Sequence, residues 1–148
     1  MRPCIFCEIV AGRAPCSEVY QDASFMAFMD IHPFSPGHVL VIPKRHWTRV
    51  GQVPSDTRQQ LFELTCRLAQ AVRESSIACD DLHFLINDGR HASQTVPHVH
   101  MHILPRRRGD AGARIAGLLA RPFVSLLGPA PGARLDRQAA LIRAHIDQ

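Results

Sequence analysis

The stretch His98-Val99-His100-Met101-His102-Ile103 alternates imidazole with apolar side chains. Successive side chains of a β-strand point to opposite faces of the sheet, so strict alternation predicts a strand with one buried face. We expect the three histidines to line one face and the apolar residues to enter the core. A polar strand face that is rich in histidine by chance is the alternative, and three imidazoles at strict alternation argue against it.

The spacing of the imidazoles bears on whether they bind a metal ion. At about 3.3 Å per residue, the Cα atoms of His98 and His102 would lie about 13 Å apart. One ion with bonds of about 2 Å can bind two adjacent alternate histidines, but hardly all three in tetrahedral geometry. An unprotonated imidazole can instead attack phosphorus, while a protonated neighbour donates to the departing oxygen or nitrogen. Two adjacent histidines of the row could play both parts.

The remaining sequence predicts a small α+β domain, with an antiparallel five-stranded sheet and one main covering helix. The expected strands are apolar runs at residues 18–21, 25–31, 38–43, 83–87 and 98–104. Ser55 is the expected N-cap of the main helix. Its apolar stripe recurs at helical spacing and contains Leu61, Leu64, Leu68 and Val72. Shorter helical segments are expected at residues 4–11 and 135–145.

Composition favours a single domain over residues 1–148. The chain has 148 residues, of which 46% are hydrophobic and 20% charged. No run approaches the ~18 apolar residues that span a bilayer, and the N-terminal apolar run is too short for a secretory signal. The five cysteines, an odd number, are more readily thiols than a disulfide framework. We therefore expect a cytoplasmic protein with no membrane contact.

The charge of the chain favours anionic ligands without naming one. The formal net charge is +4 and the pI is near 9.1, which suits phosphates. The only dense basic cluster is Arg106-Arg107-Arg108, and little aromatic interleaving lies beside it. This pattern argues against nucleic acid as a partner.

Through its three alternating histidines the chain resembles the histidine-triad family, in which H-x-H-x-H precedes two apolar residues, here Ile103 and Leu104. Further segments carry the resemblance: Ile5-Phe6-Cys7, Phe28-Met29-Asp30-Ile31, Gly37-His38, Val41-Ile42-Pro43-Lys44-Arg45-His46, Asn87-Asp88-Gly89 and Gln94-Thr95-Val96. It runs in order over about residues 4–106 and leaves the tail, 107–148, outside. The resemblance implies an α+β fold and a homodimer.

The resemblance also implies the roles of the catalytic residues. His100 would be the nucleophile that forms a nucleotidyl-imidazole intermediate, which water then hydrolyses. His102 would hydrogen-bond the phosphate and assist the development of charge. Thr95 would contact the phosphate and the leaving group.

A second set of residues would bind the nucleotide. By the resemblance, Asp30 holds the ribose hydroxyls, and the base is walled by Ile5, Phe6, Phe28 and Ile31. Asn87 and Gln94 would contact the phosphate, with Ser93 beside them. Ordinary core packing and a purely structural loop are the alternatives for these positions. The family usually has glycine where this chain has Ser93, so the contact of that backbone with phosphate is expected to shift or tighten.

A structural zinc ion is expected near the N-terminus. Cys4-x2-Cys7 has the spacing of half a zinc site. Bacterial members of the family supply the other two ligands at positions that match His46 and His98. Free thiols or a redox pair are the alternatives, although a redox pair is expected in a βαβ context that this N-terminus lacks. The other cysteines, Cys16, Cys66 and Cys79, are expected to be ordinary thiols.

The implied function is cleavage at the α-phosphate of a purine nucleoside 5′-phosphate derivative, a phosphoramidate or an acyl-adenylate, with no metal in the chemical step. A dinucleoside polyphosphate hydrolase is the alternative within the family, because Leu104-Pro105-Arg106 also suits that branch. A nucleotide-binding or sensing protein without turnover is an alternative from another class. A zinc hydrolase with His98 and His100 as catalytic ligands is the third alternative.

Overall fold

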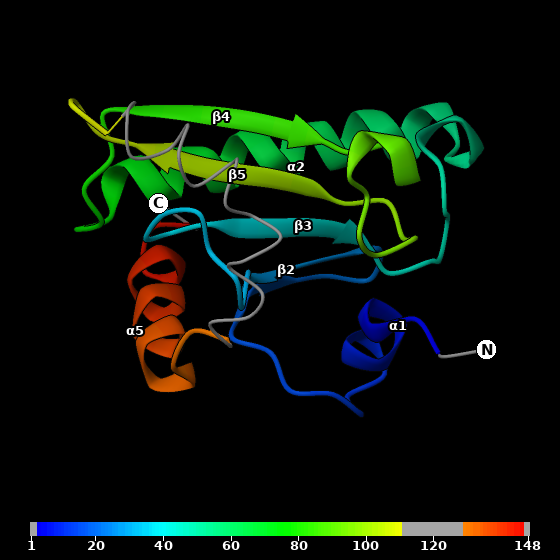
Figure 1. The fold of residues 1–148 in the computed structure, drawn as a ribbon, viewed down its shortest axis with the longest axis horizontal. Coiled ribbons are helices and arrows are strands. Elements are labelled where there is room, and N and C mark those ends of the chain that lie inside the picture. The colour runs from blue at the N-terminus through cyan, green and yellow to red at the C-terminus, as the bar shows by residue number, and fades with distance from the viewer. Residues whose placement is uncertain (1–2, 111–128, 147–148) are drawn as a thin grey trace.

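The structure is a computed structural model that describes residues 3–110 and 129–146. Its centre is a five-stranded antiparallel sheet in the order β1-β2-β3-β5-β4 (Figure 1). The strands are β1 Glu18–Gln21, β2 Phe25–Met29, β3 Val39–Pro43, β4 Asp81–Ile86 and β5 Met101–Arg106. The predicted α+β class and five-stranded sheet are confirmed. Within the C-terminal tail, residues 107–148, the segments 111–128 and 147–148 lie outside the described residues.

The alternation of side chains along β2 and β3 divides the core between the two faces of the sheet. Both strands are buried throughout. Every second side chain joins the larger core cluster, and the others form a smaller cluster with members Phe6, Met26, Phe28, Leu40 and Ile42. Phe6 belongs to the short helix α1 Ile5–Val10. Helix α1 therefore covers the face that carries the smaller cluster.

Two longer helices, α2 Ser55–Glu74 and α5 Gly132–Arg143, cover the opposite face of the sheet (Figure 1). The predicted stripe of α2 is buried in the larger cluster: Leu61, Leu64, Leu68 and Val72. Helix α5 adds Leu135, Ala139 and Ile142 to the same cluster and packs on α2, β1 and β2. Helix α5, which lies in the tail that the motifs leave out, is thus part of the core. Within the described residues, no helix has the length and apolar character needed to cross a membrane.

Several predicted boundaries are wrong by a few residues. Strand β5 begins at Met101, because the N–H of Val99 donates to Trp47 O (2.7 Å) and leaves the strand ladder. Pro54, not Ser55, is the N-cap of α2. The last helix covers residues 132–143 and so begins three residues before its predicted start. Its N-cap is Pro131, and a proline is tolerated there because the first N–H groups of a helix have no partner within the helix. Single 3₁₀ turns lie at η1 Val50–Gln52 and η2 Arg90–Ala92.

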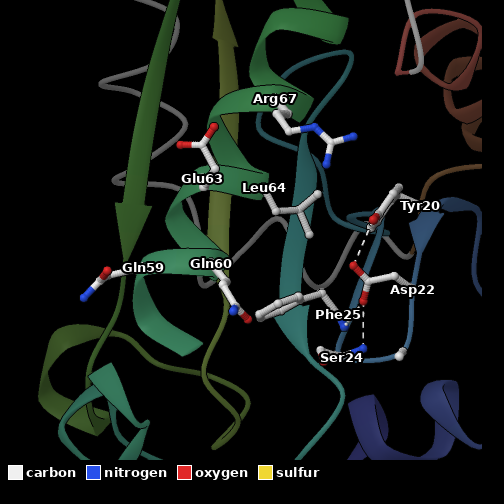
Figure 2. Close-up of a pocket in the computed structure, with 10 residues that line it drawn as sticks. Tyr20, Asp22, Ser24, Phe25, Gln59, Gln60, Glu63, Leu64 and Arg67 are labelled. Atoms are coloured by element: carbon white, nitrogen blue, oxygen red, sulfur yellow. Dashed lines mark hydrogen bonds between the residues drawn. The ribbon is translucent and has the colours of Figure 1, made fainter. Parts of the chain in front are cut away.

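A groove of about 720 Å³ lies between the β1–β2 hairpin and α2 (Figure 2). Tyr20 and Asp22 line one side, where the tyrosine hydroxyl donates to the carboxylate (2.8 Å). Phe25 and Leu64, also in its lining, belong to the larger core cluster. The groove therefore opens on the face that α2 and α5 cover, and its lining contains neither histidine nor cysteine.

Candidate active site

The three histidines of the alternating stretch lie together against α1. His102 belongs to β5 and pairs with Leu40 of β3, whereas His98 and His100 precede the strand. All three side chains are buried. The ring centroid of His100 lies 4.9 Å from that of His102, and Phe6 meets His98 and His100 edge-on at 5.8 Å and 5.3 Å. The imidazoles thus form a row, although only the last one lies on a regular strand.

A main-chain hydrogen bond sets the tautomer of His100. Its Nδ1 lies 2.6 Å from the carbonyl oxygen of His98. A carbonyl oxygen only accepts, so Nδ1 carries the hydrogen. In the neutral ring the lone pair is then on Nε2. The bond also holds the ring in one orientation, which a nucleophile requires.

His38, just before β3, is a site residue for which the sequence analysis predicted no role. The N–H of Phe34 donates to His38 Nδ1 (3.2 Å), so a neutral His38 carries its hydrogen on Nε2. That Nε2 lies 2.9 Å from Nδ1 of His102. His102 therefore accepts at Nδ1, and its own hydrogen is on Nε2. The sequence signal for this residue was the Gly37-His38 motif. Its role becomes visible only in the fold, where β3 lies beside β5 and His38 meets His102.

Asp30, at the end of β2, completes this buried group. Its Oδ2 lies 3.5 Å from His38 Nε2, and its Oδ1 accepts the N–H of His32 (2.8 Å). The donor atoms of Asp30, His38 and His102 all lie within 4.8 Å of one another, a spacing that a metal ion could use. A ligating Nε2 must be unprotonated, whereas the bond from Phe34 places the hydrogen of His38 there. The group is therefore a hydrogen-bonded His38–His102 pair with the Asp30 carboxylate beside it, rather than a second metal site.

The four apolar residues expected around a base differ in exposure. Phe6 and Phe28 are buried and pack edge-to-face with ring centroids 5.4 Å apart. Ile5 and Ile31 are 47% and 50% exposed, unusual for such large apolar side chains. The two phenylalanines are part of the core, whereas the two isoleucines leave apolar surface exposed.

Hydrogen bonds within the loop between β4 and β5, and one to Thr48 outside it, hold the loop residues that were expected near the phosphate. Gln94 accepts the N–H of Gly89 at Oε1 (2.8 Å) and donates from Nε2 to Thr48 O (3.0 Å). Asn87 donates to Ser93 O (3.3 Å). The side chain of Gln94 thus shapes the loop, while Thr95 is exposed.

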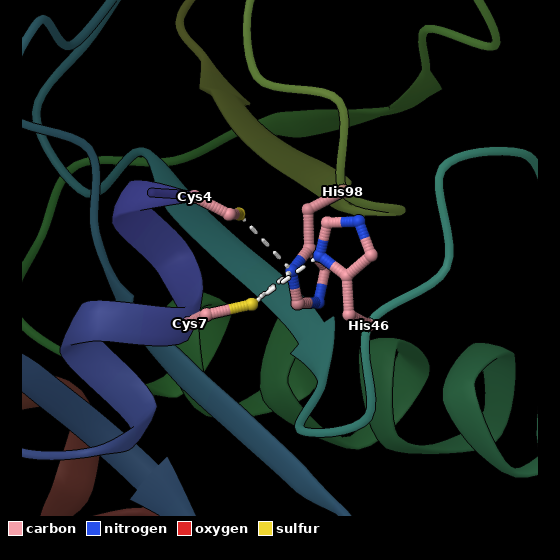
Figure 3. A group of neighbouring side chains, drawn as sticks. All are labelled: Cys4, Cys7, His46 and His98. Atoms are coloured by element: carbon pink, nitrogen blue, oxygen red, sulfur yellow. Dashed lines mark hydrogen bonds between the residues drawn. The ribbon is translucent and has the colours of Figure 1, made fainter. Parts of the chain in front are cut away.

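Cys4, Cys7, His46 and His98 converge beside the row (Figure 3). Their four donor atoms lie within 4.8 Å of one another. His98 Nδ1 is 3.6 Å from the Cys4 sulfur and 3.7 Å from the Cys7 sulfur, and His46 Nδ1 is 3.2 Å from the Cys7 sulfur. His98 Nε2 lies 2.8 Å from Pro43 O and must donate to it, so the lone pair of His98 faces the sulfurs. Two sulfurs and two imidazole nitrogens are a zinc ligand set.

The protonation states of this cluster suit a metal. Burial lowers the pKa of His98 to about 4, and the hydrogen bond to Pro43 offsets only part of that shift. His98 is therefore neutral near pH 7, as a ligand must be. Burial and the neighbouring Cys4 raise the pKa of the Cys7 thiol. A bound divalent cation would reverse that direction, because a coordinated thiol is deprotonated. The other three cysteines are free thiols, as expected.

Comparisons with known proteins agree on one family. A family model described as HIT domain matches residues 11–109. An uncharacterised HIT-like protein of Mycobacterium tuberculosis is 44% identical over 119 residues, 80% of this chain and 82% of that protein. An adenosine 5′-monophosphoramidase of Schizosaccharomyces pombe is 38% identical over 109 residues, 74% of this chain and 78% of that protein. The crystal structure of a zinc-bound histidine triad family protein from Mycobacterium smegmatis is 37% identical, with a TM-score of 0.79, and covers 97% of this chain and 92% of that chain.

Ser93 occupies a backbone conformation that favours glycine. Its φ of 64° and ψ of 26° are left-handed, and among the described residues it is the one non-glycine with positive φ. A residue with a Cβ in this conformation destabilises the folded state by roughly 1–2 kcal/mol. Glycine avoids that strain, but it offsets part of the gain because it raises the conformational entropy of the unfolded chain. We therefore expect Ser93→Gly to raise the free energy of unfolding by up to about 1 kcal/mol. A β-branched residue should do the opposite, so Ser93→Val should lower it by about 1–3 kcal/mol.

Urea denaturation at fixed protein concentration measures both changes. Ser76→Gly, at an exposed serine without positive φ, is the matched control and should not stabilise the protein. A destabilised Ser93→Gly protein would contradict the assignment of strain to this residue.

Proposed function

The chain belongs to the HIT domain family, whose model matches residues 11–109, and we propose that it hydrolyses a purine nucleoside 5′-phosphate derivative at the α-phosphorus. A phosphoramidate or an acyl-adenylate is the proposed substrate. The bond from His100 Nδ1 to the His98 carbonyl carries the proposal, because it places the ring lone pair on Nε2. The adenosine 5′-monophosphoramidase of Schizosaccharomyces pombe, 38% identical, supports a nucleotide substrate.

In the proposed mechanism, Nε2 of His100 attacks the α-phosphorus in line with the leaving group. The new P–N bond forms as the bond to the leaving group breaks; an amine takes a proton from solvent as it departs, whereas a carboxylate departs as the anion. The Nε2–H of His102 donates to a phosphoryl oxygen, where negative charge grows. Thr95 contacts the phosphate from the loop. Water then hydrolyses the nucleotidyl-imidazole, releases the nucleoside monophosphate and regenerates neutral His100.

The proposed binding mode uses the exposed apolar surface and the carboxylate near it. The purine lies between Ile5 and Ile31, with Phe6 and Phe28 behind them. Asp30 accepts hydrogen bonds from the ribose hydroxyls, since each carboxylate oxygen can accept more than one. The loop residues Asn87, Ser93 and Gln94 lie on the phosphate side, where backbone N–H groups serve as donors.

The alternatives find less support in the geometry. Arg106, which would meet the extra phosphates of a dinucleoside polyphosphate, is paired with Asp110 at 2.8 Å. In the zinc-hydrolase alternative, His98 and His100 share a catalytic ion. The lone pair of His98 faces Cys4 and Cys7 instead, beside α1.

The nucleophile is tested by trapping the intermediate. Rapid acid quench with a substrate labelled at the α-phosphate should give labelled protein in the parent and none in His100→Asn. Loss of covalent catalysis should lower turnover by about three orders of magnitude or more. His145→Asn, a histidine of the last turn outside the row, is the control and should label like the parent. Label on another residue, or near-parental turnover of His100→Asn, rejects His100 as the nucleophile. A parent that binds nucleotide without label or turnover would instead be a nucleotide-binding protein.

We further propose one structural zinc ion per chain, held by Cys4, Cys7, His46 and His98. The lone pair of His98 aimed at two sulfurs supports it, as does the zinc-bound Mycobacterium smegmatis neighbour, 37% identical. The ion would join α1 to the row of imidazoles and supplies no step of the reaction. Thiolate ligands require a reducing compartment, which fits the expected cytoplasmic location.

Purified protein should contain about one zinc per chain by elemental analysis. Replacing Cys4 and Cys7 by serine should abolish zinc and lower the thermal midpoint, because ligand bonding contributes to folding. Cys16→Ser should change neither. A chelator should lower the thermal midpoint clearly but lower the initial rate of hydrolysis only slightly. Metal-free protein of unchanged stability would exclude a structural ion.

A homodimer is proposed on the exposed edge of the sheet. Strand β4 pairs with β5 on one side only, so its other backbone edge is open within the described residues. It carries Phe84 and Leu85, 41% and 37% exposed, beside Phe62 of α2 at 51%. The rings of Phe62 and Phe84 lie 6.2 Å apart. A second copy that pairs with this edge would bury both the backbone and the apolar patch.

Light scattering after gel filtration should give twice the chain mass of 16.5 kDa. Phe84→Glu should shift the protein to the monomer, since it places a charge in the apolar interface. Leu141→Glu, at a 42% exposed leucine on α5, should leave the mass unchanged. A monomeric parent would overturn the proposed dimer.

A further inference from the structure

The turn between β2 and β3 carries the two groups that face His102. Asp30 begins the turn and His38 ends it, and the turn closes through Asp30 N–H to His38 O (3.0 Å). Inside the turn, His38 N–H donates to Ser35 O (3.2 Å). The 2.9 Å bond from His38 Nε2 to His102 therefore depends on where the main chain of this turn lies.

The C-terminal segment binds this turn at both ends. The N–H of Ala130 donates to Ile31 O (2.7 Å), one residue after Asp30. Oε1 of Gln138 accepts the N–H of Gly37 (3.2 Å), one residue before His38. Gly37 is buried with φ of 82°, and a Cβ there would meet Ile77 and Pro105 at 3.0 and 3.1 Å. With no room to shift toward those side chains, the peptide of Gly37 is held between the core and α5.

Helix α5 is itself firmly docked by contacts that do not involve the turn. Leu135, Ala139 and Ile142 are buried in the larger core cluster. Asp136 accepts the hydroxyl of Ser17 (2.6 Å), and Arg143 donates to the carbonyl of Glu18 in β1. The helix thus presents Gln138 to the turn from a fixed position.

We propose that Gln138 is a positioning residue for the His38–His102 pair, and that residues 129–146 complete the active site, although the family model ends at residue 109. The inference rests on the proposed hydrolase function. Without the acceptor at Gln138, the peptide of Gly37 turns toward another partner and His38 moves with it. His102 then loses its fixed tautomer, so the chemical step slows while the proposed nucleotide-binding surface at Ile5 and Ile31 stays intact.

Two variants of Gln138 separate this role from packing. Gln138→Met keeps the length of the side chain but removes the acceptor, and Gln138→Glu keeps an acceptor. Loss of one hydrogen bond of ordinary strength corresponds to about a three- to tenfold fall in kcat for Gln138→Met. KM should stay within about twofold of the parent, and Gln138→Glu should restore parental kcat.

Ser17→Ala is the matched control, because it removes one hydrogen bond of α5, at Asp136, while the buried side chains Leu135, Ala139 and Ile142 keep the helix and Gln138 in place. It should lower the thermal midpoint and leave kcat unchanged. Long-range ¹H–¹⁵N spectra give a readout independent of turnover. The parent should show His38 protonated at Nε2 and His102 unprotonated at Nδ1, and Gln138→Met should show both rings in tautomer exchange.

Parental kcat and spectra in Gln138→Met, or an equal loss of kcat in Ser17→Ala, would overturn the positioning role. A parent without nucleotide turnover would reject the proposed hydrolase. The spectra of Gln138→Met would still decide whether Gln138 positions the histidine pair.

Discussion

His98 makes bonds in three directions, and the site depends on all of them. One ring nitrogen donates to the carbonyl of Pro43 at the end of β3, and the other faces Cys4 and Cys7 of α1. Its main-chain carbonyl accepts from Nδ1 of His100. A single residue therefore fixes the N-terminal helix, the end of a central strand and the orientation of the next imidazole. The 0% exposure of His98 is what makes these bonds strong, since no water competes for them.

One face of the sheet carries the two supporting helices, and the other face carries the row of imidazoles. On one face, α2 and α5 seal the larger core cluster and hold β1, β2, β3 and β5 in place. On the other face, the six-residue helix α1 packs on the smaller cluster, and the imidazole row lies against its Phe6. The carboxylate and the imidazole that face His102 come from the turn between two buried strands, so a rigid scaffold positions them. The exposed residues Ile5 and Ile31 lie at the margin of this face.

Sequence patterns predicted local features well and long-range contacts poorly. Strand-like runs predicted the strands, alternation predicted the side-chain pattern of the triad segment, and helical spacing predicted the stripe of α2, because each is a local pattern of residue types. The start of β5 at Met101 was missed, since it depends on a bond between Val99 and Trp47, far apart in the chain. His38 had no assigned role for a similar reason, because its partner His102 lies 64 residues away. The spacing of Cys4 and Cys7 indicated half of a zinc site, the family resemblance supplied His46 and His98, and the structure brings the four residues together. The contribution of α5 to the core lay outside every motif.

The bond between Gly37 and Gln138 spans 101 residues, and this has a consequence for synthesis on the ribosome. Translation delivers the chain from the N-terminus, so the turn that carries His38 emerges long before the helix that holds it. A nascent chain can pair β2 with β3, and later add β4 and β5, while the turn still lacks its acceptor. The last part of the site to be ordered is then contributed by the last helix to be made. Premature termination between residues 106 and 138 would leave every motif of the family present in a chain whose site is incomplete.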